Sequence, residues 1–431
     1  MIDYGKLIQK YKPDSVEQGK ITSLVSDVTA RIKKYCLENS IDADPVLVGS
    51  VAKGTNIKSG DVDIFVTFSK KYEKREMEDL GVKIGRAVIR DGTEKYAEHP
   101  YVTGRLKGYK LDIVPSYRIN PGERKVSSVD RTPLHTDFVL KNLTAEMRDQ
   151  VILLKLFMKH FQIYGSEVRV SGFSGYICEL LIWKFENFEN VIQMFSHLSG
   201  KLVIGNTGRT NLPESPVLII DPVDDERNAA AAVSVESLST MKVASKLFVS
   251  THDEEYLNPN PPKREPAYTD RGTAIRIFRM PKPAVVDDIV YPQAVKFRNS
   301  LVDILNSGGF MPLSSEISLE GEVQILIECR DSNSPAIRTR EGPPADSDNV
   351  IDFVRKYKEI AVRGPYIIGE RIYADVRTEP ETIEQFFKEH IQDLSIGKNL
   401  ALLKNRITID NPIEGSTRFD VMDKFYSKRI T

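Results

Sequence analysis

The sequence of 431 residues predicts an α+β protein whose first part is built on one mixed sheet. Three observations support this prediction. Residues 15–38 carry apolar side chains at helical spacing, residues 61–68 alternate as a strand does, and residues 101–117 fit a hairpin that turns at Lys107-Gly108. A helix, two strands, a second helix and a hairpin in this order are typical of an α+β arrangement.

The single elements of this first part follow from their patterns. The helix over 15–38 places a set of apolar side chains on one stripe: Ile21, Leu24, Val25, Val28 and Ile32. The run PVLVGS, residues 45–50, predicts a short buried strand that ends in Gly-Ser. The run DVDIFVTF, residues 61–68, predicts a second strand, and a helix of mixed charge is predicted near residues 74–90.

The pattern then becomes helical. Thr132, followed by a proline, predicts an N-cap and a first helical turn. Residues 145–163 and 174–188 each predict a long helix that is rich in Leu and Ile. Residues 221–234 lead into a further helix near Ser237.

The run NPNPPKREP, residues 258–266, predicts a linker because Asn and Pro resist regular structure. Beyond it, residues 272–280 and 321–330 predict strands and residues 292–305 predict a helix. We find no internal repeat in the sequence.

The chain therefore divides into three predicted parts. Residues 1–140 contain the mixed sheet, residues 141–260 are mostly helical, and residues 261–431 return to strands and helices.

Composition excludes several classes of protein. The net charge is −1 and the pI about 6.6, which argues against a protein that coats nucleic acid through bulk charge. No stretch approaches the ~20 apolar residues of a membrane span, and the N-terminus has no apolar signal region. The 3 cysteines form no CxxC pair, so the sequence predicts neither a zinc site nor a disulfide framework. A reducing cytoplasm is the predicted location.

Acidic residues form the sharpest local signal. Asp61 and Asp63 stand two apart in a predicted strand, so they share one face, roughly 7 Å apart. Asp112 lies in the later run LDIVPSY, where Leu111 and Ile113 take the opposite face. If the two strands are neighbours, only ~5 Å separates them, and three carboxylates converge.

Such a cluster repels itself unless a cation lies within it. Two divalent ions ~4 Å apart would neutralise it, activate a 3′-hydroxyl and stabilise a pyrophosphate leaving group. Oxygen ligands favour Mg²⁺. We therefore predict Asp61, Asp63 and Asp112 as catalytic residues and metal ligands; the alternative is that the first two are only turn and strand-edge residues.

Gly49-Ser50 stands eleven residues before Asp61. A glycine after an apolar strand permits a tight turn into a helix, where backbone N–H groups and the Ser50 hydroxyl can hold a triphosphate. Lys53 can reach the same phosphates as a point charge. An ordinary strand-to-helix cap is the alternative.

These segments together resemble one known family. The chain is similar to the archaeal-type (class I) CCA-adding enzymes, which are tRNA nucleotidyltransferases of the polymerase-β superfamily, from about residue 40 to 235 and more loosely to 312. The segments that carry the resemblance are GSVAKGT, DVDIFV, YAEHPYV, LDIVPSY, VDRTPLH, IYGSEVRVSGFSGYICELL and DPVDDERN. YAEHPYV and GFSGYICELL are the most discriminating.

The resemblance implies a polymerase-β-like catalytic head over 1–140, a helical neck over 141–260 that recognises the nucleotide, and an α+β body and tail over 261–431 that bind the tRNA acceptor stem. It implies addition of C, C and A to tRNA from CTP and ATP, with Mg²⁺ and no template. The sequence leaves the oligomeric state undecided, and a homodimer is one open arrangement.

Residue by residue, the resemblance implies that Ser50 and Lys53 contact the triphosphate, although the family commonly has Arg at the position of Lys53. It also places four further residues at the nucleotide, with the last facing the incoming base: His135, Lys155, Tyr164 and Arg227.

Each of those four also has a structural alternative. His135 fits a surface histidine near a helix start, and Lys155 fits the solvated stripe of a helix. Tyr164 fits a packing residue that closes the helix before a glycine, and Arg227 fits an ion pair with Asp224 or Asp225.

Two other functions share part of this pattern. A poly(A) polymerase or an oligoadenylate synthetase-like enzyme also has Gly-Ser followed by two aspartates, and use of CTP separates these enzymes from CCA addition. An RNA-binding homologue with a catalytically dead head is the second alternative, against which the intact set of three aspartates argues.

Overall fold

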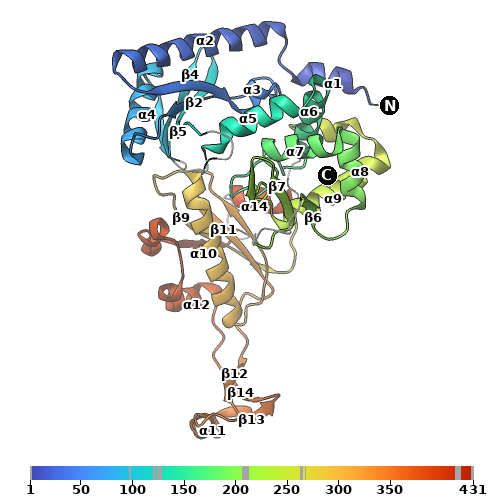
Figure 1. Ribbon diagram of the computed structural model, residues 1–431. Helices are drawn as coiled ribbons and strands as arrows, with labels where there is room; N and C mark the ends of the chain where they lie inside the picture. The colour runs from blue at the N-terminus through green and yellow to red at the C-terminus, as the bar shows by residue number, and fades with distance from the viewer. Residues whose placement is uncertain are drawn as a thin grey trace. The chain divides into compact units, whose positions relative to one another are not determined.

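The computed structural model describes residues 2–96, 99–119, 123, 129–205, 213–262, 266, 268–412 and 419–428. The chain forms two compact units that divide between Pro262 and Lys263, inside the segment 258–266 (Figure 1). The finer division into three parts stays a prediction.

The first unit begins with a mixed five-stranded sheet in the order β1-β2-β5-β4-β3, as the α+β prediction required. The strands are β1 (Ala43–Val48), β2 (Val62–Phe68), β3 (Thr93–Tyr96), β4 (Pro100–Leu106) and β5 (Tyr109–Tyr117). β2 and β5 are parallel neighbours, and the other pairs are antiparallel. The hairpin turns at Lys107-Gly108, with both residues at positive φ, as predicted.

Two helices cover one face of this sheet, α2 (Ser15–Glu38) and α4 (Lys74–Val88) (Figure 1). Alternation along β2 and β5 decides which side chains meet them. Val62 and Ile64 on β2, with Leu111 and Ile113 on β5, are buried in the core beneath these helices. The residues between them, among which are the strand aspartates, therefore face the opposite side of the sheet.

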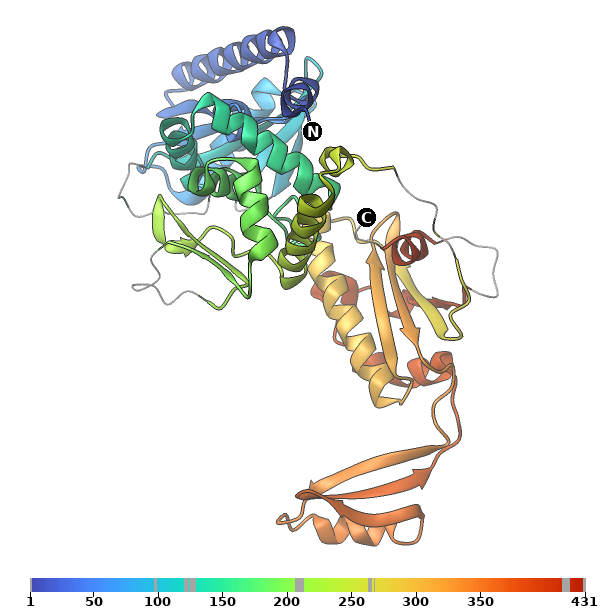
Figure 2. The ribbon, with the colours of Figure 1, turned by 90° about the vertical axis from the view of Figure 1, so that its right-hand side faces the viewer.

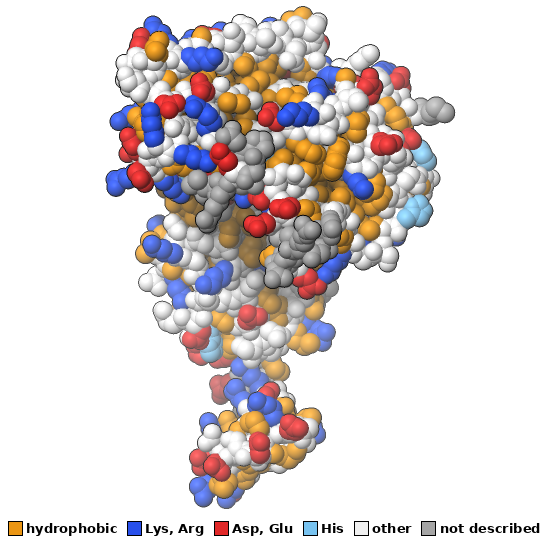
Figure 3. All heavy atoms as spheres, viewed as in Figure 1, with side chains coloured by type: hydrophobic (Ala, Val, Ile, Leu, Met, Phe, Trp, Pro, Cys, Tyr) orange, Lys and Arg blue, Asp and Glu red, His pale blue; other side chains and the backbone are white. Residues whose placement is uncertain are grey.

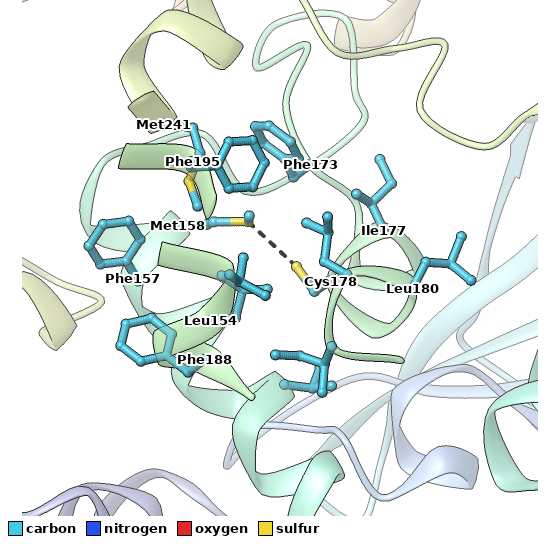
Figure 4. Close-up of a cluster of buried hydrophobic side chains, with 14 of the residues drawn as sticks. Leu154, Phe157, Met158, Phe173, Ile177, Cys178, Leu180, Phe188, Phe195 and Met241 are labelled. Carbon is cyan, nitrogen blue, oxygen red and sulfur yellow. Dashed lines mark hydrogen bonds between the residues drawn. The ribbon is translucent and has the colours of Figure 1, made fainter. Parts of the chain in front are cut away.

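A second core lies among the helices that follow. Phe157 and Met158 on one helix meet Phe173 and Cys178, and the Cys178 thiol contacts the Met158 sulfur at 3.5 Å (Figure 4). The helices of this part are α1 (Tyr4–Tyr11), α5 (Arg131–Asn142), α6 (Ala145–His160), α7 (Gly175–Phe185), α8 (Phe188–His197), α9 (Val235–Thr251) and the 3₁₀ turn η1 (Glu254–Leu257).

Several predicted boundaries in this region were wrong. α5 begins at Arg131, so Thr132 lies within the helix and does not cap it. α6 ends at His160, because Gln162 takes a positive φ and the chain turns so that Tyr164 can form a bridge with Phe173. Tyr164 therefore does not close the helix.

The predicted helix over 174–188 ends earlier, at Phe185. Ser174 caps α7 as expected, but Glu186 takes a positive φ and ends it, and α8 begins at Phe188. In addition, the helical region contains a three-stranded sheet that the sequence did not predict. Its strands are β6 (Leu202–Ile204), β7 (Val217–Asp221) and β8 (Asp224–Asn228).

The second unit is built on a four-stranded sheet in the order β10-β11-β9-β15. Its strands are β9 (Ala274–Pro281), β10 (Pro312–Ser318), β11 (Glu322–Cys329) and β15 (Thr408–Asp410). One face packs on α10 (Asp287–Ser307) and α12 (Ile383–His390), and the other on α14 (Asp420–Tyr426). The predicted helix at 292–305 is longer at its start, so that Pro292 lies inside α10.

The same unit carries a three-stranded antiparallel sheet, ordered β12-β14-β13, with α11 against it (Figure 2). Its elements are β12 (Ile337–Pro344), α11 (Val350–Tyr357), β13 (Ala361–Ile368) and β14 (Arg371–Arg377). The remaining short elements are η2 (Ile391–Asp393), α13 (Lys398–Ala401) and η3 (Lys404–Arg406).

Both signs of charge are found on every part of the face shown in Figure 3, which agrees with the near-zero net charge. Among the described residues, no helix is long and apolar enough to cross a membrane. The 3 cysteines, Cys36, Cys178 and Cys329, are free and buried.

Phe157 tests the helical core. We expect Phe157→Ala to lower the free energy of unfolding of the first unit by about 3–5 kcal/mol, because it leaves a cavity at a fully buried site. Urea denaturation followed by the fluorescence of Trp183, the chain's only tryptophan, measures this loss. Val203→Ala is the control, since Val203 is 54% exposed. Equal effects of both variants would contradict the core assignment.

Candidate active site

Asp63 and Asp112 are brought together by the pairing of two parallel strands. They are direct register partners on β2 and β5, on the face that α2 and α4 leave free. Asp61 immediately precedes β2. The structure therefore places the three predicted carboxylates in one neighbourhood, with Asp63 in the centre.

The charges of this neighbourhood act on one another. Burial, then the neighbouring carboxylates of Asp112 and Asp61, raise the pKa of Asp63 to about 7. Lys110 partly relieves this repulsion. Its ammonium pairs with Asp61 and lies 3.6 Å from Asp112, and Thr103 donates a hydrogen bond to Asp112.

Gly49 makes the close approach to this cluster possible. It follows β1 with a φ of +74°, and a Cβ atom built on it would lie 2.2 Å from Oδ2 of Asp63. Only glycine satisfies both the backbone angle and the space. Ser50 follows it as the second residue of α3 (Gly49–Lys53), so the Gly-Ser pair turns the chain beside Asp63.

The donor set suits a hard divalent cation, because it consists of carboxylate oxygens around a buried acid whose charge is opposed by its neighbours. The described side chains contain no group of three or more acidic, His or Cys residues already arranged as metal ligands. The Asp61 carboxylate forms an ion pair with Lys110. The aspartates thus fit a metal ion in chemistry and burial, with Lys110 as a competing cation.

Lys53 and Lys155 meet in a buried network beside α3. Lys53 donates to Oε2 of Glu179 at 2.6 Å, and Thr55 donates to Oε1 of the same carboxylate at 2.7 Å. Lys155 donates to the carbonyl oxygen of Thr55 at 2.8 Å. Burial lowers the pKa of Lys155, and the Glu179 carboxylate opposes this shift. The solvated stripe considered for Lys155 is therefore wrong, since its side chain is buried.

Tyr164 lies near the same network. A Cβ atom on Gly175 would lie 3.1 Å from the Tyr164 hydroxyl and 3.6 Å from the Lys155 ammonium nitrogen, so both groups lie against the first residue of α7. Burial raises the pKa of Tyr164, and its hydroxyl stays protonated at neutral pH. The structure thus brings Tyr164 to Lys155, although outside the helix that was predicted to carry it.

His135 and Arg227 converge on one carboxylate, that of Asp221. Nε2 of His135 lies 2.9 Å from Oδ2 of Asp221, and the Arg227 guanidinium donates to the same oxygen at 2.7 Å. Burial lowers the pKa of His135, opposed by the Asp221 charge, so a neutral ring donates through Nε2–H. Among the described residues, the ion pair of Arg227 is with Asp221, whereas Asp224 pairs with Arg131 at 2.5 Å.

Three residues of this site escaped the sequence prediction: Glu179, Asp221 and Tyr176. Tyr176 donates to Asp221 at 3.0 Å and stacks on His135, with ring centroids 3.9 Å apart. All three lie inside GFSGYICELL or DPVDDERN, the segments that carried the resemblance. That was the available signal, but no spacing rule links Glu179 to Lys53 or Asp221 to His135, because these partners are distant in sequence.

Comparison with known proteins decides the family. A nucleotidyltransferase domain model matches residues 29–135, a model of the second domain of tRNA nucleotidyltransferases matches 149–258, and a model of the C-terminal domain of CCA-adding enzymes matches 271–409. The CCA-adding enzyme of Thermoplasma volcanium is 45% identical over 429 residues, covering 99% of this chain and 98% of the relative.

The CCA-adding enzyme of Picrophilus torridus is 44% identical over 430 residues, with 100% of both chains covered. That of Thermoplasma acidophilum is 43% identical over 431 residues, which covers 100% of this chain and 99% of the relative. The chain belongs to the archaeal-type CCA-adding enzymes. The resemblance seen in the sequence and the polymerase-β-like α+β fold are thereby confirmed.

As a CCA-adding enzyme, the chain is a tRNA nucleotidyltransferase of the polymerase-β superfamily, and nucleotidyltransferases of this family generally use divalent metal ions. Its relatives act on tRNA with nucleotide substrates. The roles of the single site residues in this CCA-adding enzyme remain predictions.

Gly49 generates a test of the site geometry. We expect Gly49→Ala to reduce nucleotide transfer at least a hundredfold, because the new methyl group displaces the Asp63 carboxylate, and a displacement of ~1 Å costs about that much. Gly54→Ala is the matched control. Gly54 ends the same helix at a φ of +67°, but its nearest neighbour is the Arg148 side chain at 3.7 Å. Equal losses in both variants would mean that backbone strain alone matters.

Proposed function

We propose that this chain adds C, C and A to the 3′ end of tRNA at the carboxylate cluster of Asp61, Asp63 and Asp112, from CTP and ATP and without a template. Membership of the CCA-adding enzymes supports the reaction. The observation that carries the proposed centre is the pairing of Asp63 with Asp112 on parallel strands beside Gly49.

Bound to these carboxylates, Mg²⁺ would supply positive charge that lowers the pKa of the attacking hydroxyl and neutralises the leaving pyrophosphate. In the reaction, the 3′-hydroxyl of tRNA loses its proton to solvent and its oxygen forms a bond to the α-phosphorus, while the bond from that phosphorus to the bridging oxygen breaks and pyrophosphate leaves. Asp63 and Asp112 orient the two reacting groups from neighbouring strands. Asp61 would leave its ion pair with Lys110 in order to hold the metal ion.

The triphosphate is proposed to lie along α3 toward Lys53 and Lys155. The buried network contains two ammonium groups, those of Lys53 and Lys155, but one carboxylate, that of Glu179, so it carries excess positive charge when both lysines are protonated. An anion is stabilised at such a place. Ser50 contributes its hydroxyl from the start of α3, and Tyr164 and His135 contribute neutral donors.

The wider assignments are part of the same proposal. Residues 1–140 act as the catalytic head and 141–260 as the neck that recognises the nucleotide. Residues 261–431 act as the body and tail that bind the acceptor stem. Mg²⁺ as the metal, a cytoplasmic location and a homodimer stay predictions. A poly(A) polymerase or oligoadenylate synthetase is less supported, because the full-length relatives are named CCA-adding enzymes.

Asp63 tests the catalytic centre. We expect Asp63→Asn to reduce transfer a thousandfold or more, because it removes the charge that holds the metal while barely changing the shape. The measurement is incorporation of radiolabelled CTP and ATP into tRNA lacking three, two or one 3′ nucleotides, with added Mg²⁺. Asp44→Asn on β1 is the control, because Asp44 is exposed on the same sheet. If Asp63→Asn kept activity within tenfold of the unaltered chain, the assignment of Asp63 as a metal ligand would be wrong. If the unaltered chain itself had no activity, the alternative of a catalytically dead RNA-binding homologue would be favoured.

Arg227 tests base recognition. Cytosine and adenine present a ring nitrogen acceptor beside an amino group, whereas uracil and guanine present an N–H there, which a guanidinium cannot satisfy. We expect Arg227→Ala to lower the preference for CTP and ATP over UTP and GTP roughly ten- to hundredfold. The ratios of kcat/KM for the four triphosphates measure this preference. Arg131→Ala is the control, as it removes a guanidinium that pairs with the same hairpin. A uniform loss for all four nucleotides would refute the role.

A further inference from the structure

Asp221, the last residue of β7, is the most fully coordinated carboxylate of the site. Its side chain has no exposed surface, and it accepts hydrogen bonds from four donors on different segments. These donors are His135 of α5 at 2.9 Å, Tyr176 of α7 at 3.0 Å, Arg227 of β8 at 2.7 Å and the backbone N–H of Val223 at 3.1 Å. Burial alone would raise the pKa of Asp221, but these donors hold it at about 2.

The distribution of the donors matters. Oδ2 receives His135 and Arg227, and Oδ1 receives Tyr176 and Val223. A carboxylate offers about four acceptor positions, so none is left for a substrate. Asp221 therefore cannot act on the nucleotide directly. Arg227, in contrast, is 36% exposed at its side chain and can reach a ligand while its anchor is buried.

We infer that Asp221 is a positioning residue that fixes His135 and Arg227 on one oxygen atom and so sets the geometry of nucleotide recognition. This inference rests on the proposed roles of those two residues. The shared oxygen couples them, because a shift of either donor changes the acceptor of the other. His135 is held with its proton on Nε2, and its ring is held further by the stack on Tyr176.

Asparagine at this position has the same shape but one acceptor oxygen. Whichever way the amide turns, its NH₂ group faces two of the four donors, either His135 with Arg227 or Tyr176 with Val223. We therefore expect Asp221→Asn to lower the preference for CTP and ATP over UTP and GTP about tenfold or more. KM for CTP and ATP rises by a similar factor, while kcat changes less than tenfold.

Asp224 provides a matched control. Its ion pair with Arg131 joins the same two elements, α5 and β8, through a different cationic side chain. If Asp221 served only to tie α5 to the hairpin, Asp224→Asn would reproduce its effect on nucleotide preference. We expect Asp224→Asn to leave the preference within twofold of the unaltered chain, with thermal melts recorded for both variants.

A second measurement does not require an altered Asp221. NMR spectra of the chain with ¹⁵N-labelled histidine, assigned with His135→Gln, report which ring nitrogen carries the proton. We expect His135 to be neutral at pH 7 with the proton on Nε2, and Asp221→Asn to change these ring shifts while Asp224→Asn does not. A proton on Nδ1 in the unaltered chain would overturn the inference, even if Asp221→Asn failed to fold.

The kinetic outcomes separate the two levels of the proposal. If Arg227→Ala lowers nucleotide preference and Asp221→Asn does not, the positioning role is wrong and the proposed function stands. Equal effects of Asp221→Asn and Asp224→Asn would also overturn the positioning role. If Arg227→Ala leaves the preference unchanged, base recognition by Arg227 fails and the inference fails with it, whereas loss of transfer in Asp63→Asn would still support the catalytic centre.

Discussion

The burial of neighbouring carboxylates is the constraint on which the first sheet and its surroundings depend. Parallel pairing of β2 with β5 sets Asp63 beside Asp112, and burial, followed by the charges of Asp112 and Asp61, raises the pKa of Asp63 to about 7. The cluster therefore favours a nearby cation, and the ammonium group of Lys110, on the same strand as Asp112, lies against it.

The rest of the site accommodates this crowding. A glycine borders the buried acid on one side, because any side chain there would overlap with it. Beyond that glycine, buried polar groups of α6 and α7 pair with residues at the end of α3: Glu179 accepts from Lys53 and Thr55, and Thr55 also accepts from Lys155. Buried charges without such partners would cost several kcal/mol each. Residues of α6 and α7 are therefore part of the electrostatic surroundings of α3.

Much of this could be predicted from the sequence, where the signal is local. Alternation in DVDIFVTF and LDIVPSY correctly assigned the two faces of the sheet, and the helix predicted over 15–38 has those bounds in the structure. The hairpin at Lys107-Gly108 followed from its turn residues. In each case, the pattern that predicts the element is also the pattern that buries it.

The failures have a common physical cause, which is that distant contacts override local pattern. The apolar run through Ile163 continues at helical spacing, yet Ile163 accepts a hydrogen bond from Phe173 and the helix ends earlier. The run DPVDDERN has little of the apolar alternation that predicts a strand, because its acidic side chains pair with Arg131, His135 and Arg227. The hairpin of β7 and β8 was therefore not predicted. Partners that lie 86 or 126 residues apart, as in His135–Asp221 and Lys53–Glu179, leave no trace in a single sequence.

The family models treat residues 29–135 and 149–258 as separate modules, but hydrogen bonds of the site cross that division. Lys53–Glu179, Lys155–Thr55 and His135–Asp221 each join one module to the other. Separating the modules would leave the donor and the acceptor of each contact without its partner. The residues on the two sides of these contacts are therefore expected to change together during evolution. A chimera that takes residues 29–135 from one relative and 149–258 from another is expected to keep these contacts only when the donor and acceptor residues of the two relatives are compatible.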